Sequence, residues 1–215
     1  MPGTIDRLPD LEIPGHQPSR PDGADHPMRI MTRRAAGLQG PPWDARARQE
    51  VAALFDGLAP EWHTRTSPER AQVVADALDR GRVGTGDTAL ELGSGIGAYS
   101  GMLAERYATV VSTDLSVEML RLAADEPGHR LLADAHRLPI GDDRVDAVVL
   151  VNMLLFPDEV DRVLRPGGCV VWVNSSGEST PIHLMPDEVV AALPGSWRGT
   201  WARAGTGLWT VLRRA

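Results

Sequence analysis

Short, continuous apolar runs alternate with amphipathic stretches along the middle of the chain. Mostly apolar runs cover residues 88–92, 108–113, 145–151 and 169–173, of which 145–151 is interrupted only by Asp146, and a shorter one covers 130–133. Runs that are apolar throughout, rather than at every second position, are typical of strands buried on both faces of a parallel sheet. Because helical patterns lie between these runs, the sequence predicts an α/β fold with a doubly wound, mostly parallel sheet.

Two amphipathic helices are predicted before the first of these strands. Asp44 is a favourable N-cap, and apolar residues recur at helical spacing from Ala47 to Leu58. After a predicted loop at 61–66, Ser67-Pro68-Glu69 forms a second helix start, and Gly81 forms its stop. Both helices present an apolar face that can pack on the sheet.

The C-terminal part of the chain predicts a short helix followed by an antiparallel hairpin. The helix is expected from Pro186 to Leu193. The hairpin is expected at 199–214, because two strand-like segments flank the turn Gly205-Thr206-Gly207. This hairpin completes the predicted sheet without a second domain.

Residues 1–42 differ from the rest of the chain in composition. They contain eight prolines, with Gly, Asp and Arg between them. Such a segment buries too little apolar surface to offset the entropy lost on ordering, so we expect a mostly disordered tail. The alternative is that the basic residues Arg29, Arg33 and Arg34 fold over a ligand. The predicted organisation is a tail at 1–42 and one domain at 43–215, whose N-terminal helical segment covers 43–81.

Charge and cysteine content narrow the class of protein. The net charge of −7 argues against binding nucleic acid by broad phosphate neutralisation. Cys169 is the single cysteine, which indicates a reducing compartment. No apolar run approaches the roughly 18 residues of a membrane span, and residues 1–30 lack the apolar core of a signal peptide. We therefore expect a soluble, cytoplasmic protein without nucleic-acid, membrane or metal partners.

A glycine-rich turn follows the first predicted strand. Gly93, Gly95 and Gly97 lie between the apolar run at 88–92 and a helix expected to continue to about residue 106. Glycine permits positive φ and lets a ligand approach the backbone, and the helix start directs its free N–H groups at the same place. Such turns hold either a dinucleotide or S-adenosylmethionine. Asp114, about twenty positions further on, fits the dinucleotide pattern too.

Polar side chains stand at the ends of four successive predicted strands. Glu91, Asp114, Asp134 and Asn152 occupy these positions. In an open parallel sheet the ligand lies along the carboxyl ends of the strands. Chance explains one or two such residues better than it explains four beside a glycine-rich turn. The pattern therefore predicts one binding site along this edge.

These motifs together resemble the class I S-adenosylmethionine-dependent methyltransferases, and most closely the small-molecule group called methyltransferase 11 or ubiquinone-biosynthesis type. The resemblance covers about residues 50–175 and implies a Rossmann-like sheet of seven strands in the order 3-2-1-4-5-7-6, closed by a C-terminal antiparallel hairpin. The motifs that carry it are Glu91-x-Gly93-x-Gly95-x-Gly97, Asp114, Asp134-Ala135 followed by Leu138-Pro139, Asn152, Leu164-Arg165-Pro166-Gly167-Gly168 and the upstream Phe55-Asp56-x-x-Ala59-x-x-Trp62.

The resemblance also implies a role for each residue at the strand ends. The methionine part of S-adenosylmethionine would lie on the glycine loop, with an aromatic covering the cofactor. One carboxylate would accept both ribose hydroxyls. The implied cofactor residues are Gly93, Gly95, Gly97 and Glu91 for methionine, Asp114 for ribose, Asp134, Ala135 and Leu115 for adenine, Asn152 beneath the sulfonium and Trp62 as the cover.

The acceptor implied by this group is a small molecule, methylated at O, N or C. Methylation of a hydroxyl or amine can require a general base, for which His63 and His183 are the candidates; the alternative is that both are solvent-exposed loop histidines. Asn152-Met153-Leu154-Leu155 departs from the Asn/Asp-Pro-Pro-Tyr/Phe step of enzymes that methylate nucleic-acid or glutamine amino groups. Trp172 and Trp209 are expected in the core, whereas Trp43, Trp62, Trp197 and Trp201 are candidates to line an apolar acceptor pocket.

Two alternatives to a methyltransferase are open at this stage. The chain can keep the fold and the cofactor pocket without methylating, for example as a partner subunit. It can also be a nicotinamide-dependent oxidoreductase, although such enzymes do not usually carry the Arg165-Pro166-Gly167-Gly168 turn before the fifth strand.

Overall fold

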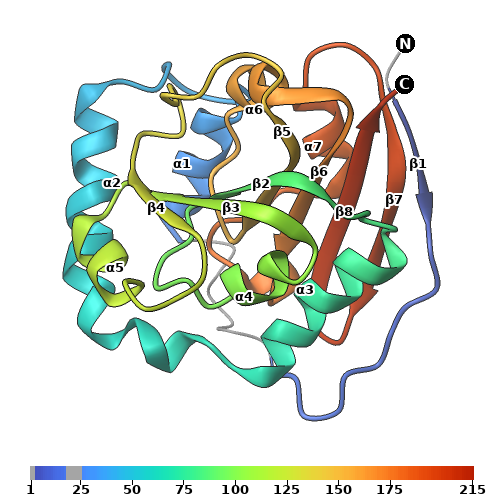
Figure 1. Cartoon of the computed structure of the whole chain (residues 1–215), viewed down its shortest axis with the longest axis horizontal. Coiled ribbons are helices and arrows are strands. Elements are labelled where there is room, and N and C mark those ends of the chain that lie inside the picture. The colour runs from blue at the N-terminus through green and yellow to red at the C-terminus, as the bar shows by residue number, and fades with distance from the viewer. Residues whose placement is uncertain (1–2, 18–25) are drawn as a thin grey trace.

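The computed structural model describes residues 3–17 and 26–215, which form one eight-stranded sheet with helices on both faces (Figure 1). The strand order across the sheet is β1-β7-β8-β6-β5-β2-β3-β4. The strands are β1 (Thr4–Arg7), β2 (Gly86–Leu92), β3 (Tyr107–Asp114), β4 (His129–Leu132), β5 (Val145–Val151), β6 (Leu164–Asn174), β7 (Trp197–Ala204) and β8 (Gly207–Arg214).

The predicted fold class is confirmed, with one strand more than expected. Strands β2 to β6 are mutually parallel, and β8 is antiparallel to both β6 and β7. Without β1, the order from β4 to β7 corresponds to the predicted 3-2-1-4-5-7-6. The additional strand, β1, pairs in parallel with β7 and forms the edge of the sheet beyond the hairpin.

The helices begin largely where the sequence predicts. Asp44 accepts a hydrogen bond from the Ala47 N–H (2.8 Å), and Ser67 accepts one from the Arg70 N–H (3.3 Å). The predicted loop at 61–66 is wrong, because most of it belongs to a 3₁₀ helix that continues from α2. The helices are α1 (Met28–Ala35), α2 (Ala45–Leu58), η2 (Ala59–Arg65), α3 (Pro68–Arg80), α4 (Ser100–Ala104), α5 (Val117–Leu122), α6 (Pro157–Val163), η3 (Gly177–Ser179) and α7 (Pro186–Ala192).

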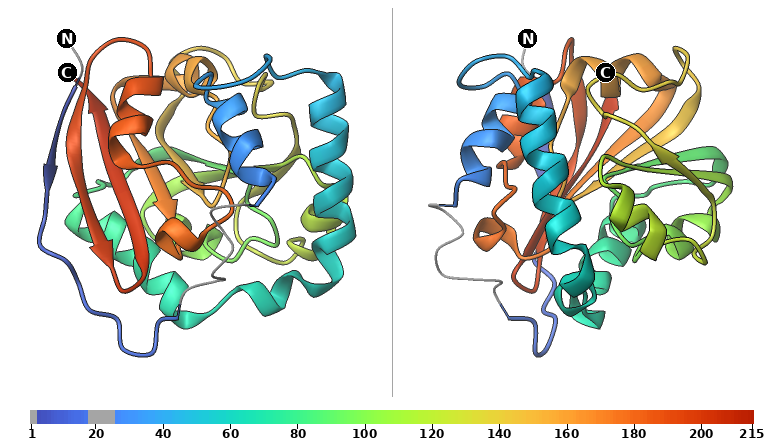
Figure 2. Two further views of the ribbon diagram at one scale, coloured as in Figure 1. Left: turned by 180° about the vertical axis from the view of Figure 1, so that it is seen from behind. Right: turned by 90° about the vertical axis from the view of Figure 1, so that its left-hand side faces the viewer.

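Two apolar cores lie on opposite faces of the sheet. Helices α1, α6 and α7 pack on the face that carries Leu150 and Trp172, and this face is toward the viewer on the left of Figure 2. Helices α3 and α4 pack on the other face, with Val149 and Trp209. Since neighbouring residues of a strand point to opposite faces, a strand such as β5 has apolar residues on both faces, with Asp146 near its start as the exception.

The expected disorder of residues 1–42 is wrong for the residues that the structure describes. The N–H groups of Leu8 and Leu11 donate to the carbonyls of Trp201 and Arg203, each at 2.9 Å, so the chain follows the edge of β7. Helix α1 buries Met28 and other residues on one face. The N-terminal segment is stabilised by its backbone pairing with β7 and by the packing of α1 on the domain, and composition does not reveal either contact. Residues 1–2 and 18–25, to which the same prediction applies, lie outside the described part of the chain.

None of the helices in the described part is long and apolar enough to cross a membrane. The longest, α2, has fourteen residues.

Candidate functional site

The glycine-rich turn after β2 has the backbone conformation that its composition predicts. Gly93, Gly95 and Gly97 have φ values of 65°, 55° and 78°, where a residue with a side chain is strained. The Ser94 N–H donates to the carbonyl of Thr113 at 2.9 Å, which attaches the turn to the end of β3. The turn is therefore a fixed loop at the carboxyl edge of the sheet.

Trp62 lies over this loop, as the resemblance implies for the segment before the first strand. A Cβ placed on Gly95 would come within 3.2 Å of the Trp62 indole nitrogen, so the ring lies close above the backbone. Phe55 packs edge-on against Trp62 at 5.5 Å between centroids, and the Arg65 guanidinium lies 5.5 Å from the ring. On the other side of the loop, a Cβ on Gly93 would overlap the side chain of Met153.

Asp114, at the end of β3, is hydrogen-bonded to the loop. Its Oδ2 accepts from the Gly95 N–H and its Oδ1 from the Ser116 N–H, both at 2.8 Å. Burial raises the pKa of Asp114, although these two N–H groups favour the charged form. Each carboxylate oxygen still has a lone pair, because an ionised carboxylate accepts about four hydrogen bonds. The side chain can thus accept two hydroxyl groups while the backbone fixes its orientation.

Glu91 lies beneath the loop and is buried. The hydroxyls of Ser100 and Ser112 donate to its Oε2 at 2.6 and 2.8 Å. Burial raises the pKa of Glu91, and the two hydroxyls oppose this shift. The carboxyl group therefore connects β2, β3 and the start of α4, and these contacts stabilise the glycine-rich loop above it.

Asp134, Ala135 and Leu115 lie around one apolar region of the site. Ala135 is buried there, and Leu115 packs against the same core. Asp134 Oδ1 accepts from the His136 N–H at 2.9 Å, and its Oδ2 accepts from the Trp43 indole N–H at 3.2 Å. The indole bond is unexpected from the sequence, which offered Trp43 only as a possible wall of the acceptor pocket.

Asn152 connects the ends of β5 and β6. Its Oδ1 accepts from the Ser175 N–H and its Nδ2 donates to the Ser175 hydroxyl, both at 2.8 Å. Asn152 has a φ of 52°, which turns the chain sharply after β5. The amide therefore fixes the geometry of this edge, whether or not it also contacts a ligand.

The two candidate general bases occupy different environments. His63 is exposed on η2, so its surroundings match the alternative of a surface histidine. His183 is only 5% exposed, and its Nδ1 has no hydrogen-bond partner among residues 3–17 and 26–215. Burial, followed by the positive charge of Arg29, lowers the pKa of His183 to about 4. His183 is thus a neutral, buried imidazole and not an exposed loop residue.

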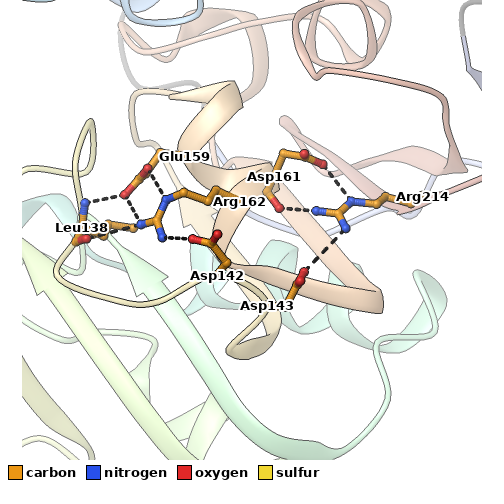
Figure 3. Close-up of polar contacts among 7 residues, drawn as sticks. All are labelled: Leu138, Asp142, Asp143, Glu159, Asp161, Arg162 and Arg214. Atoms are coloured by element: carbon orange, nitrogen blue, oxygen red, sulfur yellow. Dashed lines mark hydrogen bonds and ion pairs between the residues drawn. The ribbon is translucent and has the colours of Figure 1, made fainter.

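The loop that carries Asp134 is fastened to α6 by a charged network (Figure 3). Glu159 accepts from the Leu138 N–H at 2.5 Å and from Arg162 Nη2 at 2.6 Å. Arg162 also donates to Asp142 at 2.7 Å. The sequence gives no local signal for this network, because Glu159 contacts a residue 21 positions away.

The tryptophans divide between core and site. Trp172 and Trp209 are buried, as expected. Trp197 is also fully buried, and its indole N–H donates to the Pro194 carbonyl at 2.7 Å, so its proposed place in a pocket is wrong.

Comparison with known proteins agrees with this geometry. Residues 90–172 match the family model of a methyltransferase domain. The chain is 35% identical over 151 residues to a demethylmenaquinone methyltransferase of Mycobacterium marinum, an alignment that covers 64% of this chain and 63% of that protein. It is 28% identical over 180 residues to a malonyl-[acyl-carrier protein] O-methyltransferase of Pseudescherichia vulneris, covering 72% and 70%. The chain thus spans slightly less than two thirds of the first of these relatives.

A solved complex of DhpI with S-adenosylhomocysteine has the same fold, with a TM-score of 0.65 and 20% identity, over 78% of this chain and 97% of that one. The sheet of this chain therefore shares that fold, and residues 90–172 are similar to the methyltransferase domain family. More narrowly, the match at 90–172 and the named relatives confirm the resemblance to the small-molecule methyltransferase 11 group.

Proposed function

We propose that this protein binds S-adenosylmethionine along the carboxyl edge of its sheet and transfers the methyl group to a small-molecule acceptor. The observation that carries the proposal is the Asp114 carboxylate, held at the end of β3 by the N–H groups of Gly95 and Ser116. It stands beside a loop whose three glycines have positive φ. This combination fits a ribose next to a backbone cradle, and the carboxylate of Asp134 fits an adenine amino group.

The protein contributes mainly binding and alignment to this reaction. Bound S-adenosylmethionine supplies an electrophilic methyl group on a sulfonium that already contains its leaving group. The glycine loop holds the methionine part with support from Glu91, and Trp62 covers the loop and limits the access of water. Fixing acceptor and methyl group in line can be worth about 7–11 kcal/mol in favourable cases.

The acceptor is proposed to meet the methyl group beside Asn152, on the face covered by α1 and α7. Leu154, Ile182 and Leu184 belong to the buried apolar core on that face, and we propose an acceptor with a substantial apolar part. The names of the relatives point to a quinone-type nucleus or an acyl chain. The proposed reacting atom is an O, N or C atom of this acceptor.

His183 is the proposed general base if the acceptor is a hydroxyl or amine. Its low pKa keeps it neutral at physiological pH and able to accept a proton at Nδ1, but it also makes it a weak base. An acceptor hydroxyl of lowered pKa suits such a base best. His63, which is exposed, is the second candidate.

Calorimetric titration of the purified chain with S-adenosylmethionine, S-adenosylhomocysteine and NADH tests the cofactor. We expect micromolar affinity, about −8 kcal/mol, for the two sulfur ligands and none for NADH. Asp114→Asn keeps the shape of the side chain but removes its charge and one acceptor, so it should lower the affinity for S-adenosylhomocysteine at least tenfold. Retained affinity would refute the ribose assignment, and binding of NADH alone would favour the oxidoreductase.

A methyl-transfer assay with labelled cofactor tests the reaction itself. Reduced demethylated quinones and acyl-chain carboxylates are the first acceptors to supply. Transfer to either establishes the activity. Tight cofactor binding without transfer to a broad acceptor panel would instead support the non-methylating alternative.

A further inference from the structure

Trp43 contacts the carboxylate that the proposed function assigns to adenine. Its indole N–H donates to Asp134 Oδ2 at 3.2 Å, while the His136 N–H donates to Oδ1 at 2.9 Å. The two donors hold the carboxylate plane in one orientation. With about four acceptor sites on an ionised carboxylate, two remain for a ligand.

The position of Trp43 is fixed from both sides. Arg34, at the end of α1, donates to the carbonyls of Pro41 (2.8 Å) and Pro42 (2.6 Å) and pairs with Asp44 at 2.9 Å. Asp44 in turn caps α2. Trp43 therefore lies in a short turn attached to two helices, and its half-buried ring does not depend on a flexible linker.

The ring also has an apolar partner in the site. Trp43 packs edge-on against Phe156, with centroids 5.0 Å apart and an interplanar angle of 75°. His136 packs on the same phenyl ring at 5.8 Å. Phe156 is 4% exposed and belongs to the core that includes Ala135. The indole is thus placed by packing, and its N–H is free to serve Asp134.

We propose that Trp43 is a positioning residue for base recognition: it orients the Asp134 carboxylate so that the cofactor pocket selects a 6-aminopurine over a 6-oxopurine. This inference rests on the proposed function. An oriented carboxylate accepts from the 6-amino group, whereas it faces the oxygen of a 6-oxopurine without a proton between them. If the carboxylate can rotate, the penalty against the 6-oxo base falls. The N-terminal segment before residue 43 then contributes to the cofactor site through Arg34 and Trp43.

Trp43→Phe tests the proposal, because phenylalanine keeps an aromatic ring beside Phe156 and removes the N–H donor together with the pyrrole part of the indole. Titrations would use S-adenosyl-L-homocysteine and S-inosyl-L-homocysteine. We expect the affinity for S-adenosyl-L-homocysteine to fall about tenfold, as for one lost hydrogen bond to a charged group. The affinity for S-inosyl-L-homocysteine should change little. The preference between the two ligands should therefore fall about tenfold.

A double-mutant cycle separates orientation from packing. In an Asp134→Ala background, Trp43→Phe should leave the affinity for S-adenosylhomocysteine unchanged, because the carboxylate is absent. Trp201→Phe is the matched control. The sequence offers Trp201 as a wall of the acceptor pocket, but it is half-buried on β7, where Arg7 of the edge strand covers its ring, so both affinities should stay as in the unchanged protein.

Three outcomes would overturn the inference. Equal weakening of both ligands by Trp43→Phe would assign Trp43 a purely structural role. Tighter binding of S-adenosylhomocysteine would mean that the indole occupies the place of the base. An undiminished preference for adenine would mean that Asp134 is oriented without Trp43. If the unchanged protein binds neither ligand, the proposed function itself fails.

Discussion

Replacing Glu159 by glutamine should weaken both the fold and the proposed cofactor site. The Glu159 side chain is 11% exposed and accepts from the Leu138 N–H and from Arg162 at 2.5 to 2.8 Å. Glu159→Gln keeps the size of the side chain but removes the charge and replaces an acceptor oxygen by an amide donor. Arg162 then keeps Asp142, whose side chain is 75% exposed, as its only charged partner in this network, together with a long hydrogen bond to the Leu138 carbonyl (3.4 Å).

The expected magnitude follows from these contacts. A buried hydrogen bond to a charged group contributes about 1.5–3 kcal/mol, but Arg162 is 32% exposed, so solvent reduces the ion-pair part. We expect Glu159→Gln to lower the free energy of unfolding by about 2 kcal/mol. Urea unfolding with linear extrapolation measures this, with an unchanged slope. S-adenosylhomocysteine affinity should fall as well, because the loop between Asp134 and Asp142 loses its attachment to α6.

The pH dependence gives an independent check. Burial would raise the pKa of Glu159, but the hydrogen bonds from Arg162 and the Leu138 N–H outweigh it and lower the pKa below the usual 4.5. A lowered folded-state pKa means that the stabilisation is fully present above pH 4.5 and is lost as the pH falls through the folded-state value. The difference between the original protein and Glu159→Gln should therefore shrink in acid.

Glu118→Gln provides the control, because Glu118 pairs with Arg121 on the surface of α5, where the two side chains are 44% and 68% exposed. It should change stability by less than about 0.5 kcal/mol. The reasoning fails if Glu159→Gln also changes the free energy of unfolding by so little. It fails as well if the stability difference between the original protein and Glu159→Gln stays constant from pH 7 to pH 3.

Two further predictions concern other buried groups. Asp76→Ala should lower the free energy of unfolding by about 3–5 kcal/mol in urea, because it removes a carboxylate that accepts from the Trp209 indole and from Arg80, each at 2.6 Å. The control is Asp79→Ala, since the Asp79 side chain is 65% exposed in its pair with Arg106. Similar losses of stability for both variants would count against the burial argument. His183→Asn should keep S-adenosylhomocysteine affinity in calorimetry yet slow methyl transfer to a hydroxyl acceptor by about 10²–10⁴-fold, and unchanged turnover would exclude His183 as the base.

The sequence predicts the central sheet well because burial of parallel strands leaves a local signal. Continuous apolar runs mark β2, β3 and β5, and turn chemistry marks the glycine loop. The carboxylates Asp114 and Asp134 were found because they end strands, and strand ends meet at one edge. Their placement beside the loop and the apolar region follows from topology alone.

The parts that were missed depend on contacts between distant residues. Nothing in Thr4–Arg7 predicts a strand, since its hydrogen bonds come from β7. The bonds from Trp43 to Asp134 and from the Leu138 N–H to Glu159 join segments 91 and 21 positions apart. Such pairs depend on the finished fold, and neither composition nor periodicity contains them. The role of each cofactor residue remains a prediction until ligand binding is measured.

The edge strand β1 also sets the order in which the sheet can be completed. Thr4 pairs with Arg198, so β1 leaves the ribosome long before its partner β7 is synthesised. Domains form during synthesis, and contacts between distant residues close late. A waiting strand with exposed backbone groups invites wrong pairing, which short and charged strands resist. Strand β1 is only four residues long, and three of them, Thr4, Asp6 and Arg7, are polar or charged. Strand β1 is thus expected to join the sheet last, at an edge whose neighbouring strands are already paired.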